Sequence, residues 1–168
     1  MIDITTPTSK NYFTVQELQC RCADCERERS NGEGARGCAS NVKEWFLSHL
    51  NRVRERVYCR PMPVTSGYRC TLHPIEARKA KRAMQEGKPH ILGDHPCGVG
   101  VDVGVYGKDA HYLMQALHVY NWLHAQNELP QPFTAISPNQ RGPHHKRFIH
   151  IGGNTDAPGR KRPWDWTY

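Results

Sequence analysis

The sequence lacks three features that would assign it to a special class of protein. Its 168 residues contain no apolar run near the roughly 20 residues that a membrane-spanning helix needs. The start, Met1 to Pro7, has neither the charged nor the apolar segment of a secretory signal, so we expect synthesis in the cytoplasm. No internal repeat or low-complexity region is present. We therefore expect one domain over residues 1–168, long enough to bury its own core.

The cysteine content excludes a framework in which disulfides account for every cysteine, because the count is seven. Four of them form a C-x-C-x2-C-x12-C cluster in a polar, Cys-rich segment at about residues 12–40. They are Cys20, Cys22, Cys25 and Cys38. A structural zinc ion held by four thiolates would stabilise this segment, and so would disulfides formed outside the cell. Both interpretations stay open, as does a free state for some thiols. Cys59 and Cys70 are a further candidate pair.

Acidic residues are the minority among the charged ones, with 16 against 23 basic residues and a net charge of +7. Such an excess favours polyanionic partners. Such partners include nucleic acid, teichoic acid and an anionic cell wall. The basic residues are dispersed, which argues against nucleic acid. Their modest clusters, at residues 78–82 and 160–162, lie in no nucleic-acid-binding motif. A zinc-stabilised nucleic-acid binder built on the cysteines ranks low because no recognition helix accompanies them.

Helical and strand patterns of apolar residues alternate along the chain. The expected helices lie at about residues 40–57, 76–85 and 108–126, and the expected strands at about 64–66, 99–105, 133–136 and 147–151. Ser40 is the expected N-cap of the first helix. This order of elements indicates an α+β fold, in which helices pack against a small antiparallel sheet.

The strand at residues 99–105 carries a carboxylate in an unusual setting. Its valines recur at every second position, so Asp102 lies on the opposite face, where a glycine flanks it on each side. Aspartate is disfavoured in strands, and the glycines leave room beside it for a metal and a substrate. A turn at Pro96 and Gly98 can return the His95 ring over Asp102. His150 shows the same alternation in a second strand.

His95, Asp102 and His150 together supply the ligand set of an open zinc site. Three protein ligands leave the fourth tetrahedral position to water, whereas structural zinc sites close all four positions. The pattern therefore predicts a catalytic zinc ion and a hydrolytic reaction.

At these residues the sequence resembles the zinc D,D-carboxypeptidase and peptidoglycan endopeptidase family. That family shares its fold with the Hedgehog signalling domain and includes bacteriophage endolysins and tail-associated wall hydrolases. The resemblance extends from about Tyr12 to Trp166. The segments that carry it are the Cys-containing stretch Phe13 to Cys22, Thr65-Ser66-Gly67-Tyr68-Arg69, His-x-x-Gly-x-(small)-x-Asp from His95 to Asp102, Phe148-Ile149-His150 and Arg162-Pro163-Trp164.

The resemblance implies roles for further residues. Arg69 matches the arginine that holds a substrate carboxylate or carbonyl oxygen, and Ser66 and Tyr68 would orient it or bind the peptide. His145 falls where some relatives place a histidine that stabilises the transition state, with His144 as a competitor. The implied partners are bacterial peptidoglycan and phage tail or other virion proteins. The implied location is the virion, or the host cell wall after delivery.

The sequence departs from the family where protons are handled. Arg147 occupies the position at which several branches carry Asp or Glu, three residues before the third zinc ligand. Gly152 replaces an aspartate of another branch, and Gly93 a common serine. A water nucleophile and a leaving amine both need proton transfer. The candidates to supply it are Asp94, His145 and Asp156.

Two functions therefore remain open. The first is a zinc peptidase that hydrolyses peptide bonds of peptidoglycan during phage entry or lysis. The second is a catalytically weak or inactive structural or wall-binding virion component that keeps the fold and the metal. The complete ligand set favours the first, and the missing carboxylate favours the second.

Overall fold

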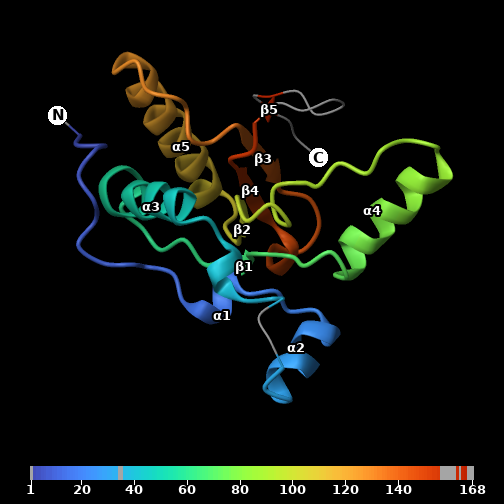
Figure 1. Cartoon of the computed structure of the whole chain (residues 1–168). Coiled ribbons are helices and arrows are strands. Elements are labelled where there is room, and N and C mark those ends of the chain that lie inside the picture. Colours follow the sequence, from blue (N-terminus) through green and yellow to red (C-terminus); the bar gives the residue numbers. More distant parts are fainter. Residues whose placement is uncertain (1, 34–35, 156–161, 163, 166–168) are drawn as a thin grey trace.

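The structure is a computed structural model that describes residues 2–33, 36–155, 162 and 164–165 (Figure 1). It confirms the expected α+β architecture. The sheet has the strand order β1-β2-β4-β3-β5, with β1 (Val64–Ser66), β2 (Gly100–Val103), β3 (Ala135–Asn139), β4 (Phe148–Gly152) and β5 (Trp164–Asp165). Neighbours among the first four strands in this order are antiparallel, whereas β5 pairs with β3 in parallel.

The α-helices are α1 (Val15–Leu18), α2 (Ala23–Ser30), α3 (Glu44–Arg52), α4 (Pro74–Gln85) and α5 (Lys108–Gln126). A π-helical segment (Val53–Tyr58) continues α3, and short 3-10 turns lie at Ala39–Asn41 and His144–Lys146. In Figure 1, α3 and α5 lie to one side of the sheet, α4 to the other, and α1 and α2 below it. Among the described residues, no helix has the length and apolar character needed to cross a membrane.

The core lies between α3, α5 and one face of the sheet. Val101 and Val103 of β2 and Ile149 and Ile151 of β4 are fully buried there, because alternate residues of a strand face the same side. The helices contribute Phe46, Leu50, Leu113, Leu117 and Tyr120 to the same cluster. Each large apolar side chain buried in this way contributes about 1.5–3 kcal/mol. The intervening residues of β2 and β4 are left for the opposite face.

The predicted helix at 108–126 has the bounds of α5, but the helix predicted at 40–57 begins later, at Glu44. Ser40 is not its N-cap and lies instead in the 3-10 turn. The reason is a tertiary contact: the Lys43 N–H donates to the Gly98 carbonyl at 2.8 Å, and the backbone before Glu44 is extended. A Cβ at Gly98 would lie 2.0 Å from the Asn41 carbonyl oxygen, so only glycine allows this approach.

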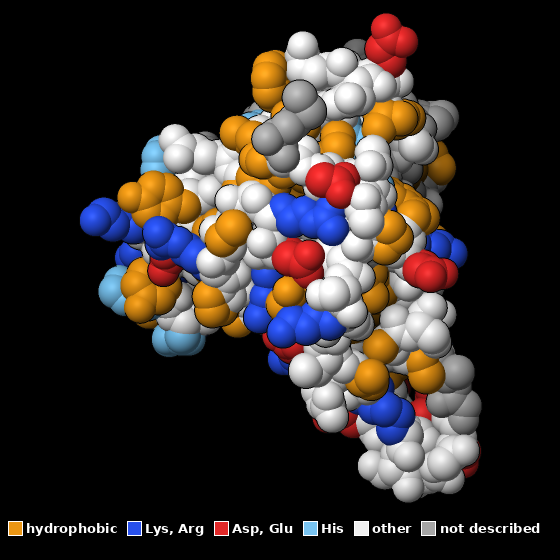
Figure 2. Space-filling model, turned by 90° about the vertical axis from the view of Figure 1, so that its left-hand side faces the viewer, with side chains coloured by type: hydrophobic (Ala, Val, Ile, Leu, Met, Phe, Trp, Pro, Cys, Tyr) orange, Lys and Arg blue, Asp and Glu red, His pale blue; other side chains and the backbone are white. Residues whose placement is uncertain are grey.

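Arginines of α3 and the π-helical segment hold the N-terminal residues against the body. Arg52 Nε donates to the Thr6 carbonyl at 3.1 Å, and Arg56 Nη1 donates to the Asp3 carbonyl at 2.7 Å. On the face seen in Figure 2, basic side chains are interspersed with acidic and apolar ones. Part of the positive charge therefore serves to attach one segment to another.

A buried aromatic cluster joins α3 to α5. His49 Nδ1 and the Tyr120 hydroxyl lie 2.9 Å apart, and the His49 and His124 rings are 5.0 Å apart. Burial, together with the nearby His124 and Arg52, lowers the pKa of His49 to about 4. The folded protein therefore holds His49 neutral near pH 6, whereas in the unfolded chain His49 binds a proton with its ordinary pKa of 6.5.

We expect the His49 contribution to stability to be present above about pH 6.5 and to be lost as the pH falls from there to about 4, since the unfolded chain then takes up the proton. The variant His49→Gln keeps a hydrogen-bonding group but does not titrate. Its free energy of unfolding should fall less between pH 7 and pH 4 than that of the wild type, by on the order of 1 kcal/mol after allowance for partial exposure. Urea unfolding at several pH values measures this difference. His90→Gln, at an exposed histidine, is the control, and an equal pH dependence in wild type and His49→Gln would contradict the prediction.

Candidate functional site

The structure brings His95, Asp102 and His150 together. Asp102 of β2 and His150 of β4 are direct partners in the strand register, and His95 lies in the turn that precedes β2. Asp102 Oδ1 lies 3.1 Å from His95 Nε2 and 2.8 Å from His150 Nδ1. One ligand atom from each residue lies within 4.8 Å of the others, a geometry that can hold a metal ion. His95 and Asp102 are buried, while the His150 side chain is 17% exposed and opens the group toward solvent.

The second nitrogen of each histidine is also engaged. His95 Nδ1 donates to the Gly67 carbonyl at 2.7 Å, and His150 Nε2 lies 3.0 Å from Asp94 Oδ2. Metal-binding histidines almost always donate their outer N–H to a carbonyl or carboxylate, which fixes the tautomer and the direction of the ring. Both rings here are held in that way.

The protonation of His95 gives an independent test of the metal fit. Burial lowers the pKa of His95, and nearby Asp102 only partly opposes this, so the ring is neutral. Its single proton lies on Nδ1, because the Gly67 carbonyl can only accept. The Nε2 lone pair therefore faces a carboxylate oxygen, acceptor against acceptor. A cation between these atoms removes the conflict, so the residues fit a metal ion.

Asp102 carries the negative charge of the group. Burial would raise its pKa, but the hydrogen bond and the positive charge of the His150 ring outweigh burial and hold the pKa well below its usual range. Burial would lower the pKa of His150, but the carboxylates of Asp102 and Asp94 outweigh burial and raise this pKa to about 9. In the absence of a cation His150 is thus protonated, and metal binding would release the proton on Nδ1.

Arg69, which was predicted to bind substrate, contacts Asp102 directly. Its Nη2 donates to Asp102 Oδ2 at 2.6 Å, and its Nε donates to the Ser66 hydroxyl at 3.0 Å. Ser66 therefore orients Arg69, which is one of the two roles expected of it. Tyr68 is partly buried against the core and the cysteines, and burial raises its pKa. A contact of these three residues with substrate stays a prediction.

Glu76 of α4 is a site residue that the sequence interpretation missed. Its side chain is 1% exposed, its Oε1 lies 3.0 Å from Lys79 Nζ and 3.8 Å from Arg69 Nη1, and its Oε2 has no hydrogen-bond partner among the described residues. In the sequence it is an ordinary acidic residue in the first turn of a helix. Only the tertiary fold reveals that it is buried beside Arg69.

His145 is not brought into this group. It lies in the 3-10 turn His144–Lys146, where its side chain is exposed. The neighbouring His144 ring stacks on Tyr106, with ring centroids 4.3 Å apart. Asp156, another candidate for proton transfer, lies outside the described residues.

Asp94 is in the site, but as the partner of His150. It also accepts from Arg162 Nη2, whose distance to each carboxylate oxygen is 2.8 Å. Burial opposes the charge of Asp94, yet His150 and Arg162 lower its pKa to about 2. A Cβ at Gly152 would lie 2.3 Å from Asp94 Oδ2. Asp94 therefore occupies the space that a side chain at position 152 would take, and it reaches that space from the turn before β2.

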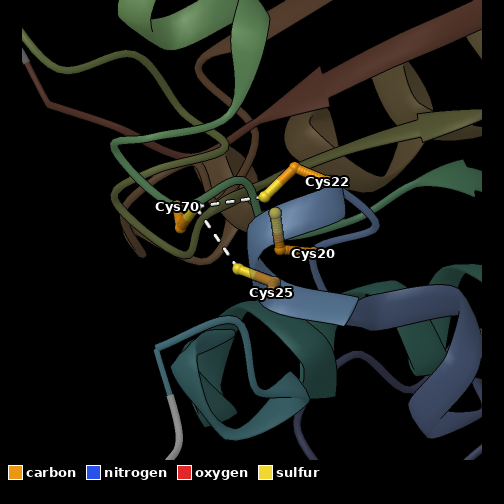
Figure 3. A group of neighbouring side chains, drawn as sticks. All are labelled: Cys20, Cys22, Cys25 and Cys70. Atoms are coloured by element: carbon orange, nitrogen blue, oxygen red, sulfur yellow. Dashed lines mark hydrogen bonds between the residues drawn. The ribbon is translucent and has the colours of Figure 1, made fainter. Parts of the chain in front are cut away.

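The structure corrects the membership of the predicted cysteine group. Three of the predicted cysteines come together, but the fourth member is Cys70 and not Cys38; all four, Cys20, Cys22, Cys25 and Cys70, are buried (Figure 3). Gly37, the residue before Cys38, lies against the group: its carbonyl accepts from the Cys20 N–H at 2.9 Å, and a Cβ there would lie 2.6 Å from Cys25 Sγ. At this point the chain contacts the group through Gly37 and not through the Cys38 side chain. Cys59 is exposed and is not paired with Cys70.

No family model and no curated protein matches the sequence.

Proposed function

We propose that the protein is a zinc peptidase that hydrolyses peptide bonds of bacterial peptidoglycan, and that it is phage-encoded and acts in entry or lysis. The observation that carries the proposal is the convergence of His95 Nε2, Asp102 Oδ1 and His150 Nδ1, with the outer nitrogen of each ring already engaged. Two imidazoles and one carboxylate are the ligand set of catalytic zinc sites that keep one position for water. The substrate class follows from the family resemblance of the sequence motifs.

The surroundings of the ligands support hydrolysis. When bound, zinc lowers the pKa of a coordinated water and polarises a scissile carbonyl. Asp94 holds His150 with its Nδ1 directed at the ligand position. Arg69 brings a fixed positive charge next to Asp102, where it can stabilise the negative charge of a tetrahedral intermediate. Glu76, with one oxygen unpartnered among the described residues, helps to position that arginine.

A second candidate function has its own support. Arg147 occupies the position of the general-base carboxylate, and His145 is exposed outside the ligand group. A wall-binding or structural virion component that keeps zinc but does not cleave peptidoglycan is consistent with both facts. Zinc content and wall clearing, measured on the same protein, separate the two functions.

Removal of a ligand tests the proposed peptidase. We expect the wild type to clear a suspension of purified peptidoglycan and His150→Ala to lose this activity together with one zinc per chain, because only two ligands remain. Metal analysis and turbidity measure the two quantities. His111→Ala, at an exposed histidine of α5, is the control and should keep both. If the wild type contains the zinc lost in His150→Ala but clears no wall, the second candidate function holds instead.

Two variants act on the hydrogen bond between Asp94 and His150. In Asp94→Asn the carboxylate that accepts from His150 Nε2 is lost, and in Gly152→Ala the new methyl group displaces it. We expect each change to weaken zinc binding at this site by roughly 10- to 100-fold, the range found for outer partners of metal-binding histidines. Competition with a chromophoric chelator measures the affinity, and circular dichroism shows whether the variants fold. Folded variants with wild-type zinc affinity would assign Asp94 a different role.

A further inference from the structure

The four buried thiols come from two segments far apart in the sequence. Figure 3 shows Cys20, Cys22 and Cys25 around the start of α2, and Cys70 on the loop that follows β1, with the side chains directed toward one another. Cys70 Sγ lies 3.6 Å from Cys22 Sγ and 3.4 Å from Cys25 Sγ. Every sulfur of the group lies within 4.8 Å of the others.

These distances describe a cluster of four rather than bonded pairs. A disulfide needs sulfurs at about 2.05 Å, and Cys70 is almost equally distant from two partners. Four thiolates around zinc, with Zn–S bonds of about 2.3 Å, place their sulfurs about 3.8 Å apart. The observed separations of 3.4 and 3.6 Å are close to that tetrahedral arrangement.

The segment that carries three of these cysteines has little else to hold it. Within α2, Cys25 is the only buried residue. The four cysteines form an apolar cluster of their own, separate from the main core, with Tyr68 packed against it. A polar segment with so small a core needs a covalent or metal link in order to stay folded.

We propose that Cys20, Cys22, Cys25 and Cys70 bind one structural zinc ion as four thiolates. All four positions of this ion are filled by protein, which distinguishes it from the open His/Asp/His group. The proposal does not depend on peptidase activity, because it rests on the cysteines alone.

The cysteine site also supports the other group through the loop at residues 66–70. Cys70 follows Arg69, the residue that donates to Asp102. The Tyr68 N–H donates to the Leu18 carbonyl at 2.8 Å, and a Cβ at Gly67 would lie 2.5 Å from the same oxygen, so the N-terminal segment lies directly on this loop. The Gly67 carbonyl in turn accepts from His95 Nδ1. Zinc at the cysteines would therefore position Arg69 and the Gly67 carbonyl for the second metal.

Zinc stoichiometry in purified protein tests the assignment. We expect two zinc ions per chain in the wild type, one in Cys22→Ser, one in Cys70→Ser and two in Cys38→Ser, the control cysteine outside the group. Titration of the folded wild type with an organomercurial, which needs no variant, should release one zinc as the four buried thiols react, after accessible thiols such as Cys59 have been consumed. After cobalt substitution, a thiolate-to-cobalt charge-transfer band should appear in both wild type and His150→Ala.

Two results would overturn the assignment. One is the recovery of these cysteines as disulfides in protein purified without reductant. The other is unchanged zinc content in Cys22→Ser and Cys70→Ser together with no zinc release by the organomercurial. The support of the second site has its own readout: loss of the thiolate-bound ion in Cys22→Ser should weaken cobalt binding at the His/Asp/His group by about 10-fold. An unchanged affinity there would restrict the zinc to holding the N-terminal segment.

Discussion

The buried carboxylate of Asp102 is the constraint on which the rest of the site depends. An ionised carboxylate is costly to remove from water unless charges and hydrogen bonds compensate it. Arg69 and His150 supply this compensation, and His95 lies against the same carboxylate; the three residues come from three different parts of the chain. The loop after β1, the turn before β2 and strand β4 must therefore all be in place around one side chain. Loss of Arg69 or His150 would leave the carboxylate undercompensated.

The partners of Asp102 are themselves held by residues farther out, and these include both ends of the described chain. Near the N-terminus, Leu18 holds the loop whose Gly67 carbonyl orients His95. Near the C-terminus, Arg162 holds Asp94, which orients His150. The two histidines of the site are thus oriented through contacts made by two segments far apart in the sequence.

The sequence alone predicted the parts of the site that follow from local periodicity. Asp102 and His150 belong to strands with alternating apolar residues, so their common face could be expected before the structure was known. The bounds of α5 were predictable for the same reason. Three features could not be predicted in this way: the exchange of Cys38 for Cys70, the late start of α3 and the burial of Glu76. Each depends on the approach of segments distant in sequence, such as Gly98 against Asn41, and no local pattern encodes that approach.

The direct pairing of Asp102 with His150 ties the metal ligands to one register of strands β2 and β4. Side chains along a strand alternate between faces, so a shift of one residue between β2 and β4 would turn Val101 or Val103 toward the ligands and Asp102 into the apolar core. The burial of four valine and isoleucine side chains opposes such a slip. The apolar face thus selects the alignment before any ion is needed. Only this register places Asp102 beside His150, so metal binding at this group would indicate that β2 and β4 are correctly aligned.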